Sequence, residues 1–405
     1  MALDSLSETG IDLPPETAIL PDTFPVRAAV AALAAATVLT AVPAVAAIRA
    51  IPAAKTSQAW KLKLATRYLP PATNRSRYDV VLVAGRAAWF FGGSNFAGNG
   101  VPKAERRQNG GWHASDLPPG LHSWIAAASA TSATNIWAVT AQDGTVINWD
   151  GTRWTAVPRG HWSTKAQFTG IVAISRANVW VFGAKSSKRA GAGTWHLSGT
   201  TWTHVKGMAA DIARASPVPP STVPPGTLQS NTASPATASP ATASPTVMWG
   251  IGGIHGTRNA LLKYSNSTWR HVTPAALGGF AYTAVLALGP SNVWVGGSVA
   301  GLPELGHFDG RRWSALTMPG LVPATGMCRD GRGGLWVIAN PGLGPSAVLD
   351  LGPKGHWHTA KVSNTSADEV LACAHVGGRD ATWGAGKAAA PAGSAAAVYG
   401  FGDVP

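Results

Sequence analysis

Acidic residues and cysteines are scarce in this chain of 405 residues. It has 19 Asp and Glu against 32 Lys and Arg, and charged residues make up only 13% of it. Glycoside hydrolysis needs two carboxylic groups about 5–10 Å apart. Asp143, Asp150 and Asp309 lie in turn sequences, and neither Asp330 nor Asp380 has a partner acid in the pattern. The shortage of acids therefore argues against a hydrolase built on a carboxylate pair.

Several catalytic and metal-binding motifs are also missing. The chain has no G-x-S-x-G, H-E-x-x-H or P-loop motif. Its two cysteines lack C-x-x-C or Cys/His metal spacing, and with five tyrosines they leave little room for a Tyr-Cys copper centre. We therefore expect no metal and no cofactor. These absences favour a non-catalytic protein, and a secreted hydrolase or oxidase is the alternative.

Short β-strands parted by turns are what the sequence does contain. Ser132 to Val157 reads SATNIWAVTAQDGTVINWDGTRWTAV, three alternating runs separated by two Asp-Gly turns. Asp-Gly between such runs is a strong hairpin signal, because both central residues of a type I′ turn need positive φ. A fourth strand is predicted at Trp124–Ala130. Four antiparallel strands in about 40 residues match one propeller blade.

The pattern recurs along the chain in two tryptophan series, which use 14 of the 18 tryptophans. The second-strand series is Trp89, Trp137, Trp180, Trp249, Trp294, Trp336 and Trp383; the fourth-strand series is Trp60, Trp112, Trp154, Trp202, Trp269, Trp313 and Trp357. Apart from one widened interval in each series, the spacing stays between 42 and 52 residues. A β-rich repeat of this length predicts an all-β, seven-bladed β-propeller of four-stranded antiparallel blades. We assign these 14 side chains to packing.

The two series are out of step at the ends of the chain, which predicts how the ring closes. A fourth-strand Trp comes first, at Trp60, and the last blade has none after Trp383. We therefore expect the segment around Ala59–Leu64 to supply the outer strand of blade seven, closing the ring and removing an exposed sheet edge. The propeller would span 58–405, preceded by a linker at 47–57, and we expect a monomer.

Residues 1–46 form a leader. Five acids and no base precede Arg27, and an uncharged apolar run follows from Ala28 to Ile48. The small-residue triplet Ala44-Val45-Ala46 resembles a signal-peptidase site. An acidic start does not suit a signal peptide, so translation from Val26 is one interpretation and an uncleaved membrane anchor is the alternative. Both predict an extracytoplasmic protein, either secreted or anchored through this segment.

Without residues 1–46 the chain carries 31 bases and 14 acids, a net charge of +17. Such a balance favours polyanionic neighbours, such as envelope polymers, acidic glycans or lipid head groups, although general solubility explains it equally well. No sequence-specific nucleic-acid motif is present. Membrane association is expected only through the N-terminal segment.

Cys328 and Cys373 stand at similar distances before Trp336 and Trp383, eight and ten residues respectively. This places both on the innermost strands of blades six and seven, where a disulfide would staple the ring in an exported protein. Two buried free thiols are the alternative.

An insertion interrupts blade four. Ala215–Thr246 is rich in Pro, Ser, Thr and Ala and includes the repeat TASPATASPATASP. Such a composition is typical of extended or disordered chain. Because the tryptophan register resumes directly afterwards, we interpret it as a long hairpin tip rather than a domain boundary.

The repeats, with NIWAV, NVWVF and NVWVG at the second strand and DGTRW and DGRRW before the fourth, resemble bacterial propeller repeats of the tectonin and kelch-like kind. The resemblance covers residues 58–403 in architecture and blades two, three and five in detail. It implies a glycan-binding or surface-recognition module. Most blades lack the double glycine of kelch repeats.

The predicted ligand site lies where outer strands connect to the next inner strands. It comprises His122, Trp124, His161, Trp162, Lys165, Phe280 and Tyr282. Trp124 and Trp162 fall outside the packing series, and aromatic faces beside polar groups suit sugar rings. For Trp124, burial between blades is the alternative. The function predicted is an exported, non-catalytic recognition propeller that binds an envelope or extracellular glycan, an anionic envelope polymer or a protein partner; a hydrolase or oxidase at the channel mouth is the alternative.

Overall fold

The computed structural model describes residues 63–68, 75–94, 100–164, 167–183, 191–207, 211–219, 247–254, 257–340, 346–360, 369–377, 379, 381–390 and 393–402. The predictions made for the leader, for Trp60, for Lys165 and for most of the blade-four insertion lie outside these residues. No helix in the described part of the chain is long and apolar enough to cross a membrane.

Seven antiparallel sheets of four strands make up the fold. From the innermost strand outward, blade one contains β2 (Ser76–Ala84), β3 (Ala87–Ser94), β4 (Val101–Gln108) and β5 (Gly111–Ala114). Blade two contains β6 (Ile125–Ser132), β7 (Asn135–Thr140), β8 (Val146–Trp149) and β9 (Trp154–Ala156). Blade three contains β10 (Gly170–Ser175), β11 (Asn178–Gly183), β12 (Gly193–Ser198) and β13 (Thr201–Val205). Blade four contains β14 (Asp211–Pro217), β15 (Met248–Ile254), β16 (Thr257–Ser265) and β17 (Thr268–Val272).

The last three blades follow the same plan. Blade five, preceded by the 3-10 turn η2 (Ala275–Leu277), contains β18 (Phe280–Gly289), β19 (Asn292–Val299), β20 (Leu302–Phe308) and β21 (Trp313–Thr317). Blade six contains β22 (Ala324–Arg329), β23 (Leu335–Ala339), β24 (Ala347–Leu351) and β25 (Trp357–Ala360). Blade seven contains β26 (Glu369–His375), β27 (Ala381–Ala390), β28 (Gly393–Gly402) and β1 (Lys63–Tyr68).

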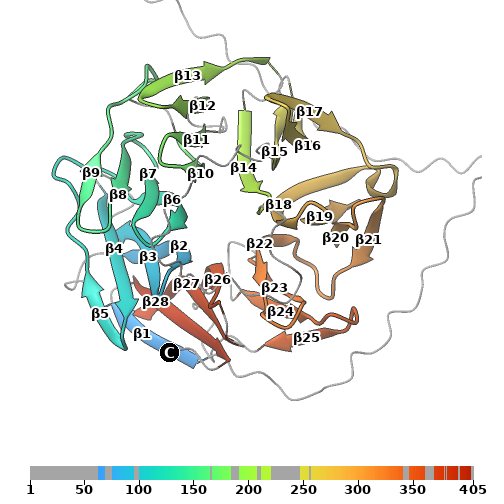
Figure 1. The fold of residues 1–405 in the computed structure, drawn as a ribbon. Coiled ribbons are helices and arrows are strands. Elements are labelled where there is room, and N and C mark those ends of the chain that lie inside the picture. Colours follow the sequence, from blue (N-terminus) through green and yellow to red (C-terminus); the bar gives the residue numbers. More distant parts are fainter. Residues whose placement is uncertain are drawn as a thin grey trace, which may run out of the picture. The chain divides into compact units, whose positions relative to one another are not determined.

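The innermost strands form a closed cycle of contacts. In order, β2, β6, β10, β14, β18, β22 and β26 each contact the next, and β26 contacts β2. Figure 1 shows these strands nearest the common axis, with the remaining strands of each blade further out. The chain is therefore a seven-bladed β-propeller, as the tryptophan period predicts.

The repeated sequence motifs have direct structural causes. In the second strand, the Asn two residues before the Trp accepts a hydrogen bond from the indole Nε1, at 2.8 Å from Trp137 to Asn135 and 2.8 Å from Trp294 to Asn292. At the third hairpin turn, Asp150 Oδ1 accepts the backbone N–H groups of Thr152 and Arg153 at 2.8 and 2.9 Å. Gly151 follows with φ 106°, a conformation that favours glycine. The Asn-x-Trp and Asp-Gly motifs are thus local devices of the fold.

Most of the serial tryptophans that the structure describes are buried between blades. Trp89, for example, is 1% exposed and lies edge-on to Trp154 of blade two at 5.7 Å. Two tryptophans outside the series, Trp149 and Trp195, are also buried, at 7% and 8% exposure. This confirms that the series are packing residues.

Blade seven combines the two ends of the described chain. Strand β1 pairs with β28, from Lys63 opposite Gly400 to Tyr68 opposite Ala396. The strand lies slightly later in the sequence than the predicted Ala59–Leu64. That the ring depends on it for closure stays a prediction.

A disulfide joins the innermost strands of blades six and seven. It links Cys328 of β22 to Cys373 of β26, whose Cα atoms lie 5.8 Å apart. Of the two alternatives open from the sequence, the structure therefore has the bonded form.

Strand β14 extends further than expected into the segment assigned to the insertion. Ala215, Ser216 and Pro217 pair with β15, and Ser216 Oγ accepts the backbone N–H of Ala287 in blade five at 2.9 Å. The predicted start of the insertion at Ala215 is therefore wrong. Backbone hydrogen bonding continues to Val218, whose N–H donates to the Val247 carbonyl at 2.8 Å.

Candidate binding site at the channel mouth

The propeller has two different faces. One face, called here the connection face, carries the links between blades and the turns from second to third strands. The opposite face, called the turn face, carries the hairpin turns from first to second and from third to fourth strands. The inner strands begin at the connection face.

Most inner strands carry a bulge near their start, where the pairing with the second strand shifts by one residue. In β2, β6, β14, β18, β22 and β26 the extra residues are Asp79, Ala126, Ala213, Thr283, Thr325 and Leu371. Bulges re-aim side chains and are common at barrel rims and beside binding sites. Asp79 is the one charged residue among these six.

Asp79 forms an ion pair with Arg77 on the same strand, at 2.8 Å from Oδ1 to the arginine Nε. Its side chain is only 16% exposed, and burial raises its pKa to about 6 although Arg77 opposes the shift. Asp79 Oδ2 is buried and has no hydrogen-bond partner among the described residues. The bulge therefore holds a carboxyl group that protonates near neutral pH.

Trp124 lies directly before β6, in the neighbouring blade. The guanidinium of Arg77 lies over its indole ring, 6.0 Å from the centroid, at the limit of a cation–π contact. The Trp124 carbonyl accepts the backbone N–H of Ala141 at 3.0 Å, which extends the pairing of blade two to this residue. The ring is half-buried, so one part packs on the propeller and another part faces solvent.

Glu369 and Lys387 form the second ion pair of the connection face, at 2.9 Å within blade seven. Asn340 of blade six donates from Nδ2 to Glu369 Oε2 at 3.3 Å. Inner strands β26, β2 and β6 are consecutive in the ring. Arg77, Asp79, Trp124, Glu369 and Lys387 therefore lie on three adjacent blades, and we call them the mouth cluster.

Arg214 is a further cation of the inner strands, at the bulge of β14 in blade four. Its side chain is exposed to solvent, yet desolvation by the surrounding protein lowers its pKa. Solvent exposure and a desolvated guanidinium are compatible if water reaches the Arg214 side chain from one side while protein surrounds it on the others. This is the environment expected at the mouth of a propeller channel.

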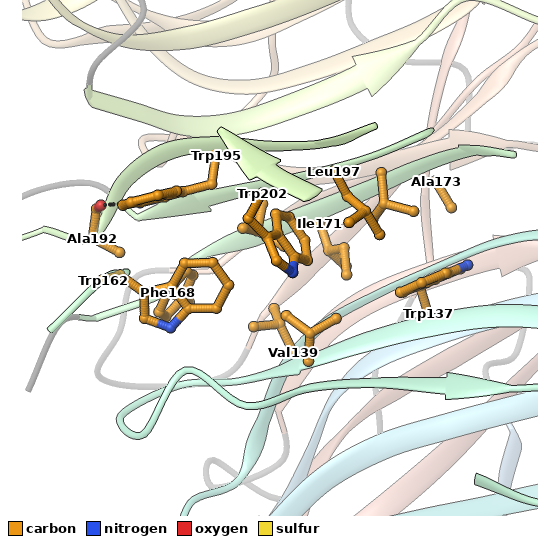
Figure 2. Packing of buried hydrophobic residues seen from close by; sticks show 13 residues of the cluster. Trp137, Val139, Trp162, Phe168, Ile171, Ala173, Ala192, Trp195, Leu197 and Trp202 are labelled. Carbon is orange, nitrogen blue, oxygen red and sulfur yellow. Dashed lines mark hydrogen bonds between the residues drawn. The ribbon is translucent and has the colours of Figure 1, made fainter. Parts of the chain in front are cut away.

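The structure contradicts the prediction that Trp162 faces a ligand. Its side chain is 6% exposed and belongs to the core between blades two and three. The ring lies edge-on to Phe168, Trp195 and Trp202, with centroids 5.4, 5.3 and 5.1 Å away (Figure 2). Its Nε1 donates to the Gly144 carbonyl at 3.1 Å. The connection between the blades folds inward and buries the indole because an apolar gap is open there.

The other predicted residues are divided between surface and interior. His122 and His161 are exposed, and the backbone N–H of His122 lies 3.3 Å from Asp143 Oδ2. Phe280 is only 4% exposed, which contradicts a ligand-facing role, because it packs in the core of blades four and five. Tyr282 is half-buried, and burial raises its pKa to about 12. Of the predicted site residues, His122 and Trp124 lie together in one link between blades, and neither is buried.

The sequence interpretation missed the four charged members of the mouth cluster. Their one signal was a charge within an otherwise apolar strand, as in SRYDVVLVA, which contains Arg77 and Asp79. It also missed an acid pair in blade six: Asp330 and Asp350, each 1% exposed. Arg332 lies 3.5 Å from Asp330 and 2.7 Å from Asp350, so a single base bridges the two buried carboxyl groups.

The mouth cluster offers ion-paired charges beside a half-exposed aromatic face. Both of its acids are held by bases, so neither is arranged as a free nucleophile beside an acid. An indole ring can stack on a flat or apolar group and a guanidinium carries hydrogen-bond donors, so Trp124 and Arg77 have the chemistry of a recognition site. Among the described residues no cluster of three or more His, Cys, Asp or Glu side chains is placed to hold a metal ion.

Comparison with known proteins supports the fold. No protein-family model matches the chain, and no curated protein matches it in sequence. A solved structure of YCF48 bound to D1 peptide is similar, with a TM-score of 0.54 and 12% identity over 87% of this chain and 99% of that one. Virginiamycin B lyase from Staphylococcus aureus, solved as a catalytically inactive variant with quinupristin, gives a TM-score of 0.56 and 8% identity, covering 85% and 100%.

A second enzyme has the same architecture. Puromycin hydrolase gives a TM-score of 0.52 and 14% identity, covering 85% of this chain and 55% of that one. At these identities the likeness extends to the fold, and membership of the tectonin or kelch families stays a prediction. The chain is a seven-bladed β-propeller of an architecture that both binding proteins and enzymes share.

Proposed function

We propose that the protein is a non-catalytic recognition propeller of the cell exterior that binds a glycan or a protein segment at the mouth cluster. The observation that carries the proposal is the half-exposed Trp124 ring beside the Arg77 guanidinium at the start of neighbouring inner strands. A planar aromatic face stacks on a sugar ring or an apolar side chain, while a guanidinium donates to oxygen acceptors. YCF48, solved with a bound peptide, supports the view that propellers of this architecture serve binding.

The exported location rests on the leader sequence and on the disulfide. A disulfide is typical of oxidising compartments outside the cytosol. The apolar run from Ala28 to Ile48 and the Ala44-Val45-Ala46 triplet support export.

The test is a binding screen with the full chain on an array of neutral and acidic glycans and of extended peptides. Trp124→Ala and Arg77→Ala should each weaken the selected interaction at least about tenfold, because central aromatic and Arg residues dominate binding energy. Trp124→Phe, which keeps a ring, should retain most of the affinity. Arg159→Ala is the matched control, since Arg159 is an exposed base of the same face outside the mouth cluster. Equal binding by all four variants would place the site elsewhere.

An enzymatic role is the second candidate, and Asp79 is the observation that favours it. A carboxyl group whose burial raises its pKa to about 6 has the protonation behaviour of a general acid. If the protein hydrolyses an array compound, and Asp79→Asn abolishes this hydrolysis while binding of the compound persists, the enzymatic candidate replaces the recognition role.

A further inference from the structure

Basic side chains outnumber acidic ones in the described turns of the turn face. Exposed bases lie in the hairpin turns of six blades; they include Arg86, Arg153, Arg176, Arg311, Lys354 and Arg379. Because these turns belong to blades one, two, three, five, six and seven, the positive charge surrounds most of the ring. No single groove gathers it.

Acidic groups offset only part of this charge in the described turns. Hydrogen bonds lower the pKa values of Asp150 and Asp309, so both are ionised, and each offsets one neighbouring base, Arg153 and Arg312 respectively. Asp330 and Asp350 are buried around Arg332. The exposed surface of the turns therefore presents mainly guanidinium and ammonium groups.

The connection face has a different balance. There, Asp116, Asp143, Glu304 and Glu369 lie among the described bases, and the last of these is paired with Lys387. The excess of positive charge in the described chain is therefore concentrated on the face opposite the mouth cluster.

The chain also enters the propeller at the turn face. Strand β1 begins at Lys63, which pairs with Gly400 near the C-terminal end of β28. This end of β28 lies at the turn face. The sequence before it contains the apolar run from Ala28 to Ile48, followed by Arg49, Lys55 and Lys61. The strand that follows the apolar part of the sequence thus begins at the face that carries the exposed bases.

We propose that the turn face docks on an anionic lipid surface and leaves the mouth cluster pointing away from it. A broad ring of bases suits a flat array of head groups, because bases within about 10 Å of a charged surface each contribute at physiological salt. Each such base strengthens binding about fivefold. The site of chain entry favours a membrane over a soluble polyanion, since the sequence that carries the apolar run joins the propeller at this face.

The experiment measures binding of the full chain to lipid vesicles by co-sedimentation. Vesicles of phosphatidylcholine with about one-third phosphatidylglycerol, the fraction chosen to give a marked negative surface potential, are compared with pure phosphatidylcholine. The turn-face variant carries Arg86→Gln, Arg153→Gln and Arg311→Gln. The matched control carries Arg75→Gln, Arg159→Gln and Lys206→Gln, three exposed bases of the connection face. Both variants lose the same net charge, and circular dichroism verifies that both are folded.

The turn-face variant should bind phosphatidylglycerol vesicles at least about tenfold more weakly than the parent, while the control should stay within about twofold. Raising the salt concentration should erase the difference. Equal loss in both variants would mean that net charge alone acts, and unchanged binding of the turn-face variant would mean that the apolar segment alone binds; either result overturns the proposal. A third result would also overturn the proposal. If the turn-face variant lost binding to a soluble acidic polysaccharide but kept its binding to vesicles, the turn face would be assigned to a polymer.

Discussion

Replacing Trp162 by alanine should test whether an indole outside the repeat register is part of the core. The side chain is 6% exposed and touches three aromatic rings within about 5.5 Å. Truncating a buried Trp costs about 3–5 kcal/mol through lost burial and the cavity left behind. The hydrogen bond to the Gly144 carbonyl adds about 1 kcal/mol. We therefore expect Trp162→Ala to lower the free energy of unfolding by about 5 kcal/mol.

Trp124 supplies the comparison, because its ring is half-buried and lies beside the Arg77 guanidinium. Trp124→Ala should cost about 1–2 kcal/mol, as partial burial implies. Both free energies come from urea denaturation followed by circular dichroism, with Trp162→Phe as a variant that keeps a ring in the core. If Trp162→Ala unfolds at the parent's urea concentration while Trp124→Ala is severely destabilised, the assignment of the two residues is reversed and the reasoning fails.

Three further predictions concern the ring and its pH dependence. Replacing Cys328 and Cys373 by serine removes a link between residues 45 apart, which should lower the free energy of unfolding by about 4 kcal/mol in denaturant melts, whereas an unchanged midpoint would show that the link is redundant. A chain beginning at Arg75 lacks β1 and should melt at a lower temperature because β28 becomes an exposed edge; unaltered calorimetry would exclude a role of β1 in closure. His196 and His307 stack on Trp180 and Trp294, and burial lowers the pKa of both below the usual 6.5. The unfolded state then binds more protons, so stability should be full above about pH 6.5 and should fall by up to about 1.4 kcal/mol per pH unit for each His as the pH drops below it, a slope that His196→Gln should reduce.

The architecture was predictable because the blades repeat a small set of local devices, most clearly in blades two, three and five. A Trp that fills each gap between blades and an Asp-Gly or Asn-x-Trp motif at fixed places create a period that stands out in the sequence. The register placed Cys328 and Cys373 on the inner strands of neighbouring blades and left the disulfide as one of two alternatives. Cys328 lies opposite Trp336, whereas Cys373 lies one position before the residue opposite Trp383.

The candidate site was only partly predictable, because a site is made where the repeats differ. Six inner strands share a bulge that the alternating sequence pattern does not reveal, and only in blade one is the bulged residue charged, Asp79, with Arg77 two residues before it. Trp162 misled for the opposite reason: departure from the register suggested exposure, yet the connection carries its indole into the gap between two blades. Gly144 and Gly160 were the available signal, because a side chain on either would collide with the Trp162 ring.

The contact between the first and last blades has a consequence for the time course of folding. Ser76 Oγ accepts the backbone N–H of Ala396, a partner 320 residues away in the chain, at 2.9 Å. A growing polypeptide cannot make this bond until nearly all of it has left the ribosome, so the ring stays open throughout synthesis. Contacts of such long sequence separation also make folding slow. Closure of the ring is therefore a late step, which follows synthesis of both the first and the last blade.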